Sequence, residues 1–94
     1  MFDIRRDEQG IVRLSGRFDA SQAQKARTVL DDVEAAMTID FSELKYISSA
    51  GIGELLHVQK RLMASGQTLH LANMTDHIKD IFTYAGLHTI FKID

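Results

Sequence analysis

Two adjacent serines, Ser48 and Ser49, are the residues of this sequence best placed to do chemistry. A strand-like run precedes them, and Ala50-Gly51-Ile52-Gly53 opens an amphipathic stretch after them. A hydroxyl at the start of a helix lies beside free backbone N–H groups and the positive end of the helix dipole. Such a position tolerates a phosphate group without breaking the fold. The pair therefore predicts either a plain helix cap or a phosphorylation switch.

Other kinds of chemistry at this segment fail on spacing. A serine hydrolase elbow has the pattern Gly-x-Ser-x-Gly, and no glycine stands two residues before Ser49. A phosphate-binding loop needs a lysine where this chain has Glu54, and a Gly-x-Gly-x-x-Gly pattern fails at Leu56. A small nucleotide-binding module stays open as an alternative, because Gly51 and Gly53 would let an anion approach the backbone. No enzymatic activity is expected.

The remaining ionisable residues indicate no metal site and no cofactor. The chain has no cysteine, and none of its four histidines pairs with another at metal-ligand spacing (His57, His70, His77 and His88). The carboxylates Asp19 and Asp40 come near the ends of two expected strands. Each is expected to cap a helix or a turn, and Asp19 also to contribute to the surface beside the serines.

The composition bounds the class of protein. Ninety-four residues with 45% hydrophobic and 26% charged content predict a single domain over residues 1–94. A formal net charge of −2 gives no field that attracts nucleic acid or an anionic membrane. The N-terminus is charged from its third residue, and no apolar run approaches the ~20 residues that span a bilayer. A cytoplasmic protein is expected.

The hydrophobic periodicity predicts eight elements in the order β-β-α-β-α-β-α-β. Strands are expected near residues 2–6, 10–17, 37–41, 67–72 and 89–93, and helices near residues 20–35, 50–64 and 75–85. Asp19 and Ser21 are both candidate caps of the first helix, and Ser21 followed by Gln24 matches a capping box. The order is typical of an α/β fold with a mixed, largely parallel sheet.

This topology positions the serines. Loops that follow parallel strands gather at one edge of a sheet, so the Ser48-Ser49 loop is expected beside the loop at Arg17-Phe18-Asp19. The helix after the serines has an expected apolar face of Ile52, Leu55, Leu56, Leu62 and Met63. The same spacing leaves an exposed face for a partner, made of Glu54, His57, Val58 and Arg61.

The whole chain resembles the STAS domain, and most closely the small bacterial anti-sigma factor antagonists. The resemblance is carried by Gly16-Arg17-Phe18-Asp19 after the second strand and by Tyr46-Ile47-Ser48-Ser49-Ala50-Gly51-Ile52-Gly53. The later strand at Gly66 to Ala72 and the helix end at Gly86-Leu87 also fit the family pattern. The resemblance implies a STAS-like mixed β-sheet with helices.

In that family the phosphorylated residue is the serine that precedes the small residue and the glycine, which is Ser49 here. Two features depart from the family pattern. Ser48 stands where an aspartate is usual, and it is an alternative acceptor. The helix that many members add after the last strand is missing beyond Asp94.

The resemblance implies partner switching with no catalytic activity of the domain itself. An unmodified antagonist binds an anti-sigma factor, often a serine kinase of histidine-kinase-like ATPase fold. Phosphorylation releases it, and a serine phosphatase restores the binding form. The partner-binding residues are then expected to be Asp19, Ser48, Ser49, Ala50, Gly51, Glu54, His57, Val58 and Arg61. The alternative within the family is a STAS subunit of another assembly, such as a lipid ABC transporter accessory or a partner switch without a sigma factor.

Overall fold

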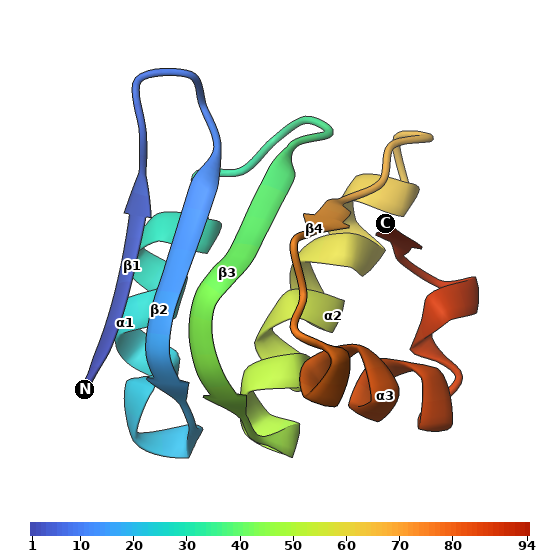
Figure 1. Ribbon diagram of the computed structural model, residues 1–94. Helices are drawn as coiled ribbons and strands as arrows, with labels where there is room; N and C mark the ends of the chain where they lie inside the picture. Colours follow the sequence, from blue (N-terminus) through green and yellow to red (C-terminus); the bar gives the residue numbers. More distant parts are fainter.

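A sheet of five strands in the order β1-β2-β3-β4-β5 organises the computed structural model, which describes all residues from Met1 to Asp94. β1 pairs antiparallel with β2, and every other neighbouring pair is parallel. Helices α1 and α2 lie behind the sheet in Figure 1, and α3 lies below β4. The predicted order of elements and the mixed sheet are confirmed.

The element bounds are as follows. The strands are β1 (Phe2–Arg6), β2 (Val12–Phe18), β3 (Thr38–Ile47), β4 (His70–Ala72) and β5 (Lys92–Ile93). The helices are α1 (Ala23–Leu30), α2 (Ser49–Met63) and α3 (Asp76–Tyr84), with 3₁₀ turns η1 (Ala20–Gln22) and η2 (Leu87–Thr89). None of the helices is long and apolar enough to cross a bilayer.

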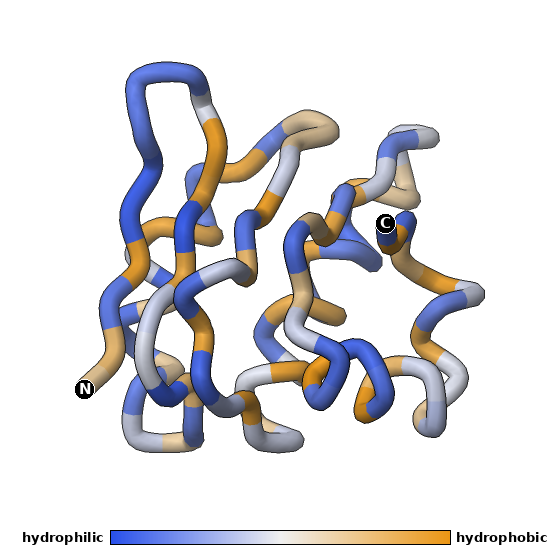
Figure 2. Tube along the Cα trace, in the orientation of Figure 1, coloured by the Kyte–Doolittle hydropathy of each residue, from blue (hydrophilic) through white to orange (hydrophobic).

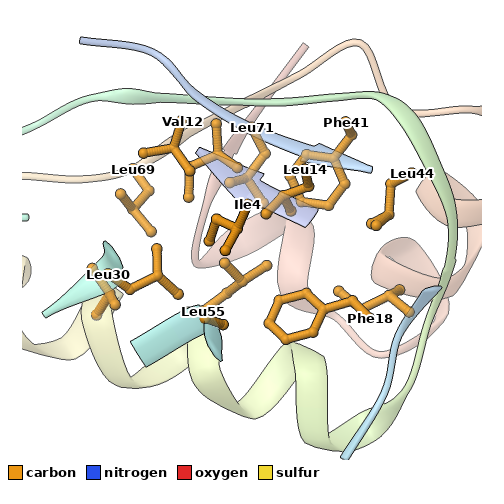
Figure 3. Packing of buried hydrophobic residues seen from close by; sticks show 14 of the residues in the cluster. Ile4, Val12, Leu14, Phe18, Leu30, Phe41, Leu44, Leu55, Leu69 and Leu71 are labelled. Carbon is orange, nitrogen blue, oxygen red and sulfur yellow. The ribbon is translucent and has the colours of Figure 1, made fainter. Parts of the chain in front are cut away.

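One hydrophobic core holds the two layers together (Figure 3). Alternate side chains of the strands point into it, which is why β1 and β2 alternate between buried and more exposed positions. Phe41 of β3 packs edge-on against Phe82 of α3 at 6.0 Å between ring centroids. The hairpin that joins β1 to β2 is hydrophilic (Figure 2), and its Asp7 carboxylate accepts hydrogen bonds from the backbone N–H groups of Gln9 and Ile11.

The third strand is twice as long as its alternation predicts. It was expected to end near residue 41, but β3 continues to Ile47 in parallel pairing with β2. The pairing of β3 with β2 contains two bulges, and at each bulge β3 has one residue more than β2. As a result the buried positions Phe41, Leu44 and Ile47 are spaced by three instead of two. That spacing hides a strand from a search for alternation.

Helix α1 is shorter than predicted. It begins at Ala23, after the turn η1, and ends at Leu30 instead of residue 35. The negative charges of Asp31 and Asp32 at a helix C-terminus oppose the helix dipole and favour an end there. Asp19 is the cap of η1, as predicted, whereas Gln22 precedes α1 without a side-chain cap, so the predicted Ser21 capping box is wrong.

The last two strands are also shorter than predicted. β4 keeps only His70–Ala72 of the expected 67–72, and β5 keeps only Lys92–Ile93 of the expected 89–93. The side-chain amide of Gln59, 1% exposed, occupies the space between them. Its nitrogen donates to the Ile90 carbonyl at 2.7 Å, and its oxygen accepts the Leu69 N–H at 2.8 Å. The buried amide thus replaces strand pairing at this place.

Asp40 was expected near a strand end, but it lies inside β3 and is only 4% exposed. Its carboxylate accepts hydrogen bonds from Arg13 at 2.7 Å, from Asn73 at 2.8 Å and from the Ser42 hydroxyl at 2.9 Å. Burial raises the pKa of Asp40, but the hydrogen bonds from Asn73, Ser42 and Arg13 outweigh it and hold the pKa below its ordinary value. The ionised carboxylate therefore ties together β2, β3 and the loop after β4.

Replacing this carboxylate is expected to weaken the fold. Asp40→Asn points an amide N–H₂ group at other donors, so the free energy of unfolding at pH 7 should fall by about 1–3 kcal/mol. The folded-state pKa is depressed, so the unfolded state takes up the proton first. The wild-type protein should therefore lose stability as the pH falls through 3.8, the ordinary value, and Asp40→Asn should show less of this loss.

Urea denaturation between pH 3 and pH 7 measures both effects. Asp80→Asn is the control, because Asp80 is exposed in the middle of α3 and its side chain makes no hydrogen bond or ion pair. Equal stability of Asp40→Asn and wild type across this range would contradict the assigned role of Asp40.

Candidate functional site

Strands β2 and β3 end side by side, and helix α2 begins at that edge (Figure 1). Phe18, the last residue of β2, is the register partner of Ile47, the last residue of β3. The backbone N–H of Ser48 then donates to the Phe18 carbonyl at 2.9 Å. The predicted neighbourhood of the Ser48-Ser49 loop and the Arg17-Phe18-Asp19 loop is thereby confirmed.

Ser48 is the N-cap of α2. Its backbone is extended, with φ −92° and ψ 171°, and its hydroxyl oxygen accepts the Gly51 N–H at 3.2 Å. The hydroxyl is half-buried at this position. An aspartate carboxylate is an equally good cap, so a serine or an aspartate at position 48 would start the helix in the same way.

Ser49 is the first residue of α2, and it is exposed. Its hydroxyl takes part in none of the side-chain hydrogen bonds of the structure, in contrast to that of Ser48. The N–H groups of Ser49 and Ala50 belong to the first turn and have no carbonyl one turn earlier to bond. The arrangement presents a free hydroxyl beside unpaired N–H donors at the positive end of a 15-residue helix.

Gly51 lets α2 approach the sheet. A Cβ at this position would lie 2.8 Å from the Phe18 carbonyl oxygen and 2.9 Å from Cγ1 of Ile47. Because one of these atoms belongs to the backbone, the glycine is required by packing. Gly51 is buried, so its predicted contribution to a partner surface reduces to setting the position of its neighbours.

Asp19 lies on the same edge and is engaged within its own loop. Its carboxylate accepts hydrogen bonds from the Ser21 hydroxyl at 2.6 Å and the Ser21 N–H at 3.1 Å. These bonds hold the pKa of Asp19 below its ordinary value, and the positive charge of Arg17 adds to the effect. Asp19 is therefore an ionised group next to the serine loop.

Arg17 and Tyr46 form a feature that the sequence interpretation missed. The Arg17 guanidinium stacks over the Tyr46 ring at 4.2 Å from its centroid, and the two residues are register partners on β2 and β3. A cation–π pair between two strands requires that its two residues lie opposite each other in the strand pairing. The two bulges of β3 change which residues lie opposite each other. No signal in the sequence gives that register.

Of the two residues predicted on the exposed side of α2 near Ser49, His57 is exposed, whereas Glu54 is only partly exposed because it pairs with Arg27 of α1. The Glu54 carboxylate accepts two hydrogen bonds from Arg27 of α1, at 2.9 and 3.0 Å. This carboxylate raises the pKa of Arg27 above its ordinary value. His57 is exposed on the next turn. The ion pair between Arg27 and Glu54 links the beginning of α2 to α1.

The predictions for two other residues of α2, one expected in the partner surface and one in the apolar face, need correction. Val58 is 2% exposed and belongs to the core, whereas Met63, predicted to be buried, is 54% exposed. The buried stripe runs through Leu55, Val58 and Leu62 at the helical spacing of three and four residues. Val58 therefore presents no side chain to a partner.

Arg61 serves the fold at the far end of α2. Its guanidinium donates to the backbone carbonyls of Leu30 at 3.0 Å and Val33 at 2.5 Å, where α1 ends. The helical rise places it about 18 Å along the axis from Ser49. This distance separates Arg61 from the serine edge.

The comparisons with known proteins agree with this geometry. The family described as "Mlab, STAS domain" matches residues 2–93. The chain belongs to the STAS domain family. A curated relative, BtrV of Bordetella bronchiseptica, is assigned as an anti-sigma factor antagonist and is 33% identical over 85 residues, which cover 90% of this chain and 72% of BtrV. The predicted resemblance to STAS domains of the anti-sigma factor antagonist group is confirmed.

Two solved structures show the same fold. An assigned anti-sigma factor antagonist of Thermotoga maritima matches with a TM-score of 0.78 and 18% identity, over 99% of this chain and 85% of the other. The Bacillus cell fate determinant SpoIIAA, in its phosphorylated form, matches with a TM-score of 0.69 and 18% identity, over 100% of this chain and 91% of the other.

The geometry predicts separate roles for the two serines in this STAS domain. Ser48→Ala removes the cap and should lower the free energy of unfolding by about 0.5–2 kcal/mol, whereas Ser48→Asp should keep it. Ser49→Ala should change it by less than about 0.5 kcal/mol, since the Ser49 hydroxyl has no partner to lose. Chemical denaturation measures all three variants. A Ser49→Ala loss as large as that of Ser48→Ala would refute this division.

Proposed function

We propose that this STAS domain is an anti-sigma factor antagonist switched by phosphorylation of Ser49. In the unmodified form it binds an anti-sigma factor and frees the sigma factor; in the phosphorylated form it is released. The observation that carries the proposal is the exposed, unpaired Ser49 hydroxyl at the first position of α2. The assignment of BtrV as an anti-sigma factor antagonist and the SpoIIAA fold, solved in a phosphorylated form, support it.

The geometry favours Ser49 over Ser48 as the acceptor. The Ser48 hydroxyl is half-buried and already accepts the Gly51 N–H at 3.2 Å. A phosphate on Ser48 would have to displace that cap or crowd the end of β2. The Ser49 hydroxyl has neither obstacle, so a kinase can reach it without opening the fold.

A phosphate on Ser49 is compatible with the folded state. It adds about −1.5 to −2 charges at neutral pH. The unpaired N–H groups of the first turn and the positive end of α2 compensate for part of this charge. The domain therefore stays folded in both states, and the phosphate changes what the surface can bind.

The same phosphate weakens docking. The ionised carboxylate of Asp19 lies in the loop next to the start of α2. A phosphate on Ser49 adds to this negative charge, which a partner would have to desolvate. Changing the bound fraction from 99:1 to 1:99 requires about 5.5 kcal/mol of differential affinity. A doubly charged group at the centre of an interface is of the right size to supply it.

The proposed partners follow from this cycle. The anti-sigma factor acts as a serine kinase of histidine-kinase-like ATPase fold, and a serine phosphatase restores the unmodified form. The domain is their substrate and ligand, works by binding and needs no cofactor. The proposed docking surface consists of Asp19, Ser49, Ala50, Glu54 and His57. Ser48 and Gly51 lie beneath it and fix the position of its residues.

A second candidate is the STAS subunit of another assembly, such as an accessory of a lipid-transporting ABC complex. The observation that favours it is the name of the matching family, which refers to Mlab. Affinity purification from native cells discriminates between the two. Recovery with a membrane transporter, with Ser49 unmodified throughout growth, would favour the second candidate.

Substitution at position 49 tests the proposal. Ser49→Ala should bind the anti-sigma kinase like wild type and accept no phosphate, whereas Ser49→Asp should bind at least about tenfold more weakly. Titration calorimetry and phosphosite mapping by mass spectrometry measure these outcomes. Gln9→Glu is the charge-matched control, because it adds one negative charge on the exposed hairpin at the opposite end of β2. Phosphate incorporation that persists in Ser49→Ala would exclude Ser49 as the acceptor.

A further inference from the structure

Strand β1 is an edge of the sheet, and its outer side is open. It stands first in the strand order, and no element lies beyond it in Figure 1. An open edge presents unpaired backbone N–H and C=O groups, which can pair with another strand unless a bulge, a proline or a covering segment prevents it. The pairing of β1 with β2 is regular, and the chain has no proline. A further strand can therefore add to β1.

The even-numbered residues of β1 carry the free backbone groups. At the two ends of the β1–β2 ladder, Met1 and Asp7 form backbone hydrogen bonds to the β2 side. Bonded and non-bonded pairs alternate in an antiparallel ladder, so the odd-numbered residues of β1 bond to β2 throughout. The N–H and C=O groups that point outward belong to Phe2, Ile4 and Arg6. Accordingly, the Phe2 carbonyl accepts a hydrogen bond from Lys25 of α1 at 2.9 Å.

The exposed side chains of β1 carry opposite charges two residues apart. Asp3 and Arg5 lie on the sheet face opposite α1 and α2, because Phe2 and Ile4 are buried on the helix side. Arg5 forms no ion pair or side-chain hydrogen bond within the chain. Its neighbour on β2 is Arg13, which is paired with two carboxylates of its own. Arg5 is thus a cation without a counterion in its own chain.

We propose that two copies of this chain associate through β1, paired antiparallel about a two-fold axis at Ile4. Ile4 then lies opposite the partner's Ile4, and Phe2 lies opposite the partner's Arg6. Each of these pairs exchanges two backbone hydrogen bonds and continues the sheet from one copy to the other. On the exposed face, Asp3 lies opposite the partner's Arg5. This association goes beyond the proposed function and does not depend on it.

The charges select this register. Asp3 and Arg5 are its non-hydrogen-bonded positions, where the side chains of facing residues come closest. An axis displaced by one residue in either direction places Asp3 opposite the partner's Asp3 or Arg5 opposite the partner's Arg5, and like charges directly opposite are destabilising. An axis displaced by two residues leaves most of β1 unpaired. The register at Ile4 pairs all five residues of β1 and places opposite charges together on both sides of the axis.

Lys25 partly obstructs this edge. Its Nζ donates to the Phe2 carbonyl and lies 3.6 Å from the Asp3 carboxylate. A carbonyl has two lone pairs, so Phe2 can accept an incoming N–H as well. Lys25 does compete with the partner's Arg5 for Asp3, and both of these side chains of one copy are about half exposed. One short strand from each copy also makes a small interface, so the association is weak and depends on concentration.

The antiparallel pairing leaves both serine sites free. β1 begins at the end of the sheet where β2 ends and α2 begins (Figure 1). The two-fold axis reverses the second copy, so the two Ser49 hydroxyls lie at opposite ends of the joined sheet. Association through β1 and modification of Ser49 are therefore independent events.

Charge reversal tests the proposal on the untagged chain, because β1 starts at Phe2. Sedimentation equilibrium up to about 1 mM protein should show a wild-type dimer. Asp3→Arg or Arg5→Glu alone places like charges opposite one another, so the dimer Kd should rise at least about tenfold. A mixture of the two variants restores opposite charges at every facing pair and should associate about as tightly as wild type. Lys79→Glu, which reverses an exposed charge on α3, should dimerise like wild type.

Two further measurements place the contact at β1. Lys25→Ala should dimerise more tightly than wild type, because it removes the competitor for Asp3. The amide N–H groups of Ile4 and Arg6 should exchange with solvent more slowly as the protein concentration rises, since they point outward in the monomer and are bonded in the dimer.

A wild-type chain that stays monomeric at about 1 mM would overturn the proposal. So would charge-reversal variants that dimerise like wild type, a mixture that fails to associate although both variants are folded, a weakened Lys25→Ala dimer, or exchange at Ile4 and Arg6 that does not slow with concentration. None of these results bears on Ser49, whose role is measured by binding to the kinase.

Discussion

The close approach of helix α2 to the end of strand β2 is the constraint on which the rest of the site depends. The Ser48 N–H bonds the Phe18 carbonyl at 2.9 Å, and Gly51 leaves no room for a Cβ against the same residue. These two contacts fix where the helix begins and in which direction its first turn faces. Ser49 is exposed because Ser48 and Gly51 are held against the sheet. The fold thus positions the hydroxyl without using it.

Much of the fold could be predicted because its signals are local. Helix α2 was placed within one residue at each end, since Ser48 caps it and Gly66 follows it in a left-handed conformation with φ +76°. The length of β3 could not be predicted, because its bulges depend on pairing with β2 and break the alternation that marks a strand. The buried amide of Gln59 gave no signal, since its partners on β4 and near β5 come together only in the folded chain.

For the site, the sequence predicted the position of the serines but not the full set of exposed residues around them. The position of the serines followed from topology, because carboxyl ends of parallel strands meet at one edge. Only the packing of the folded chain shows which positions of α2 face outward. Val58 is buried, and the Arg61 side chain is hydrogen-bonded to the end of α1. The Arg27–Glu54 ion pair joins residues of two different helices, so no spacing within the sequence predicts it. A surface assembled from several elements is a property of the folded chain.

The central claim is that a doubly negative group at position 49 leaves the fold intact and abolishes docking. The most direct measurement compares the protein phosphorylated enzymatically on Ser49 with the unmodified protein. Thermal unfolding compares the stability of the two forms, and titration with the anti-sigma kinase compares their affinities. The account predicts nearly equal Tm values and an affinity lower by about 10⁴-fold. Equal affinity of the two forms, or a phosphorylated form that is unfolded, would contradict it.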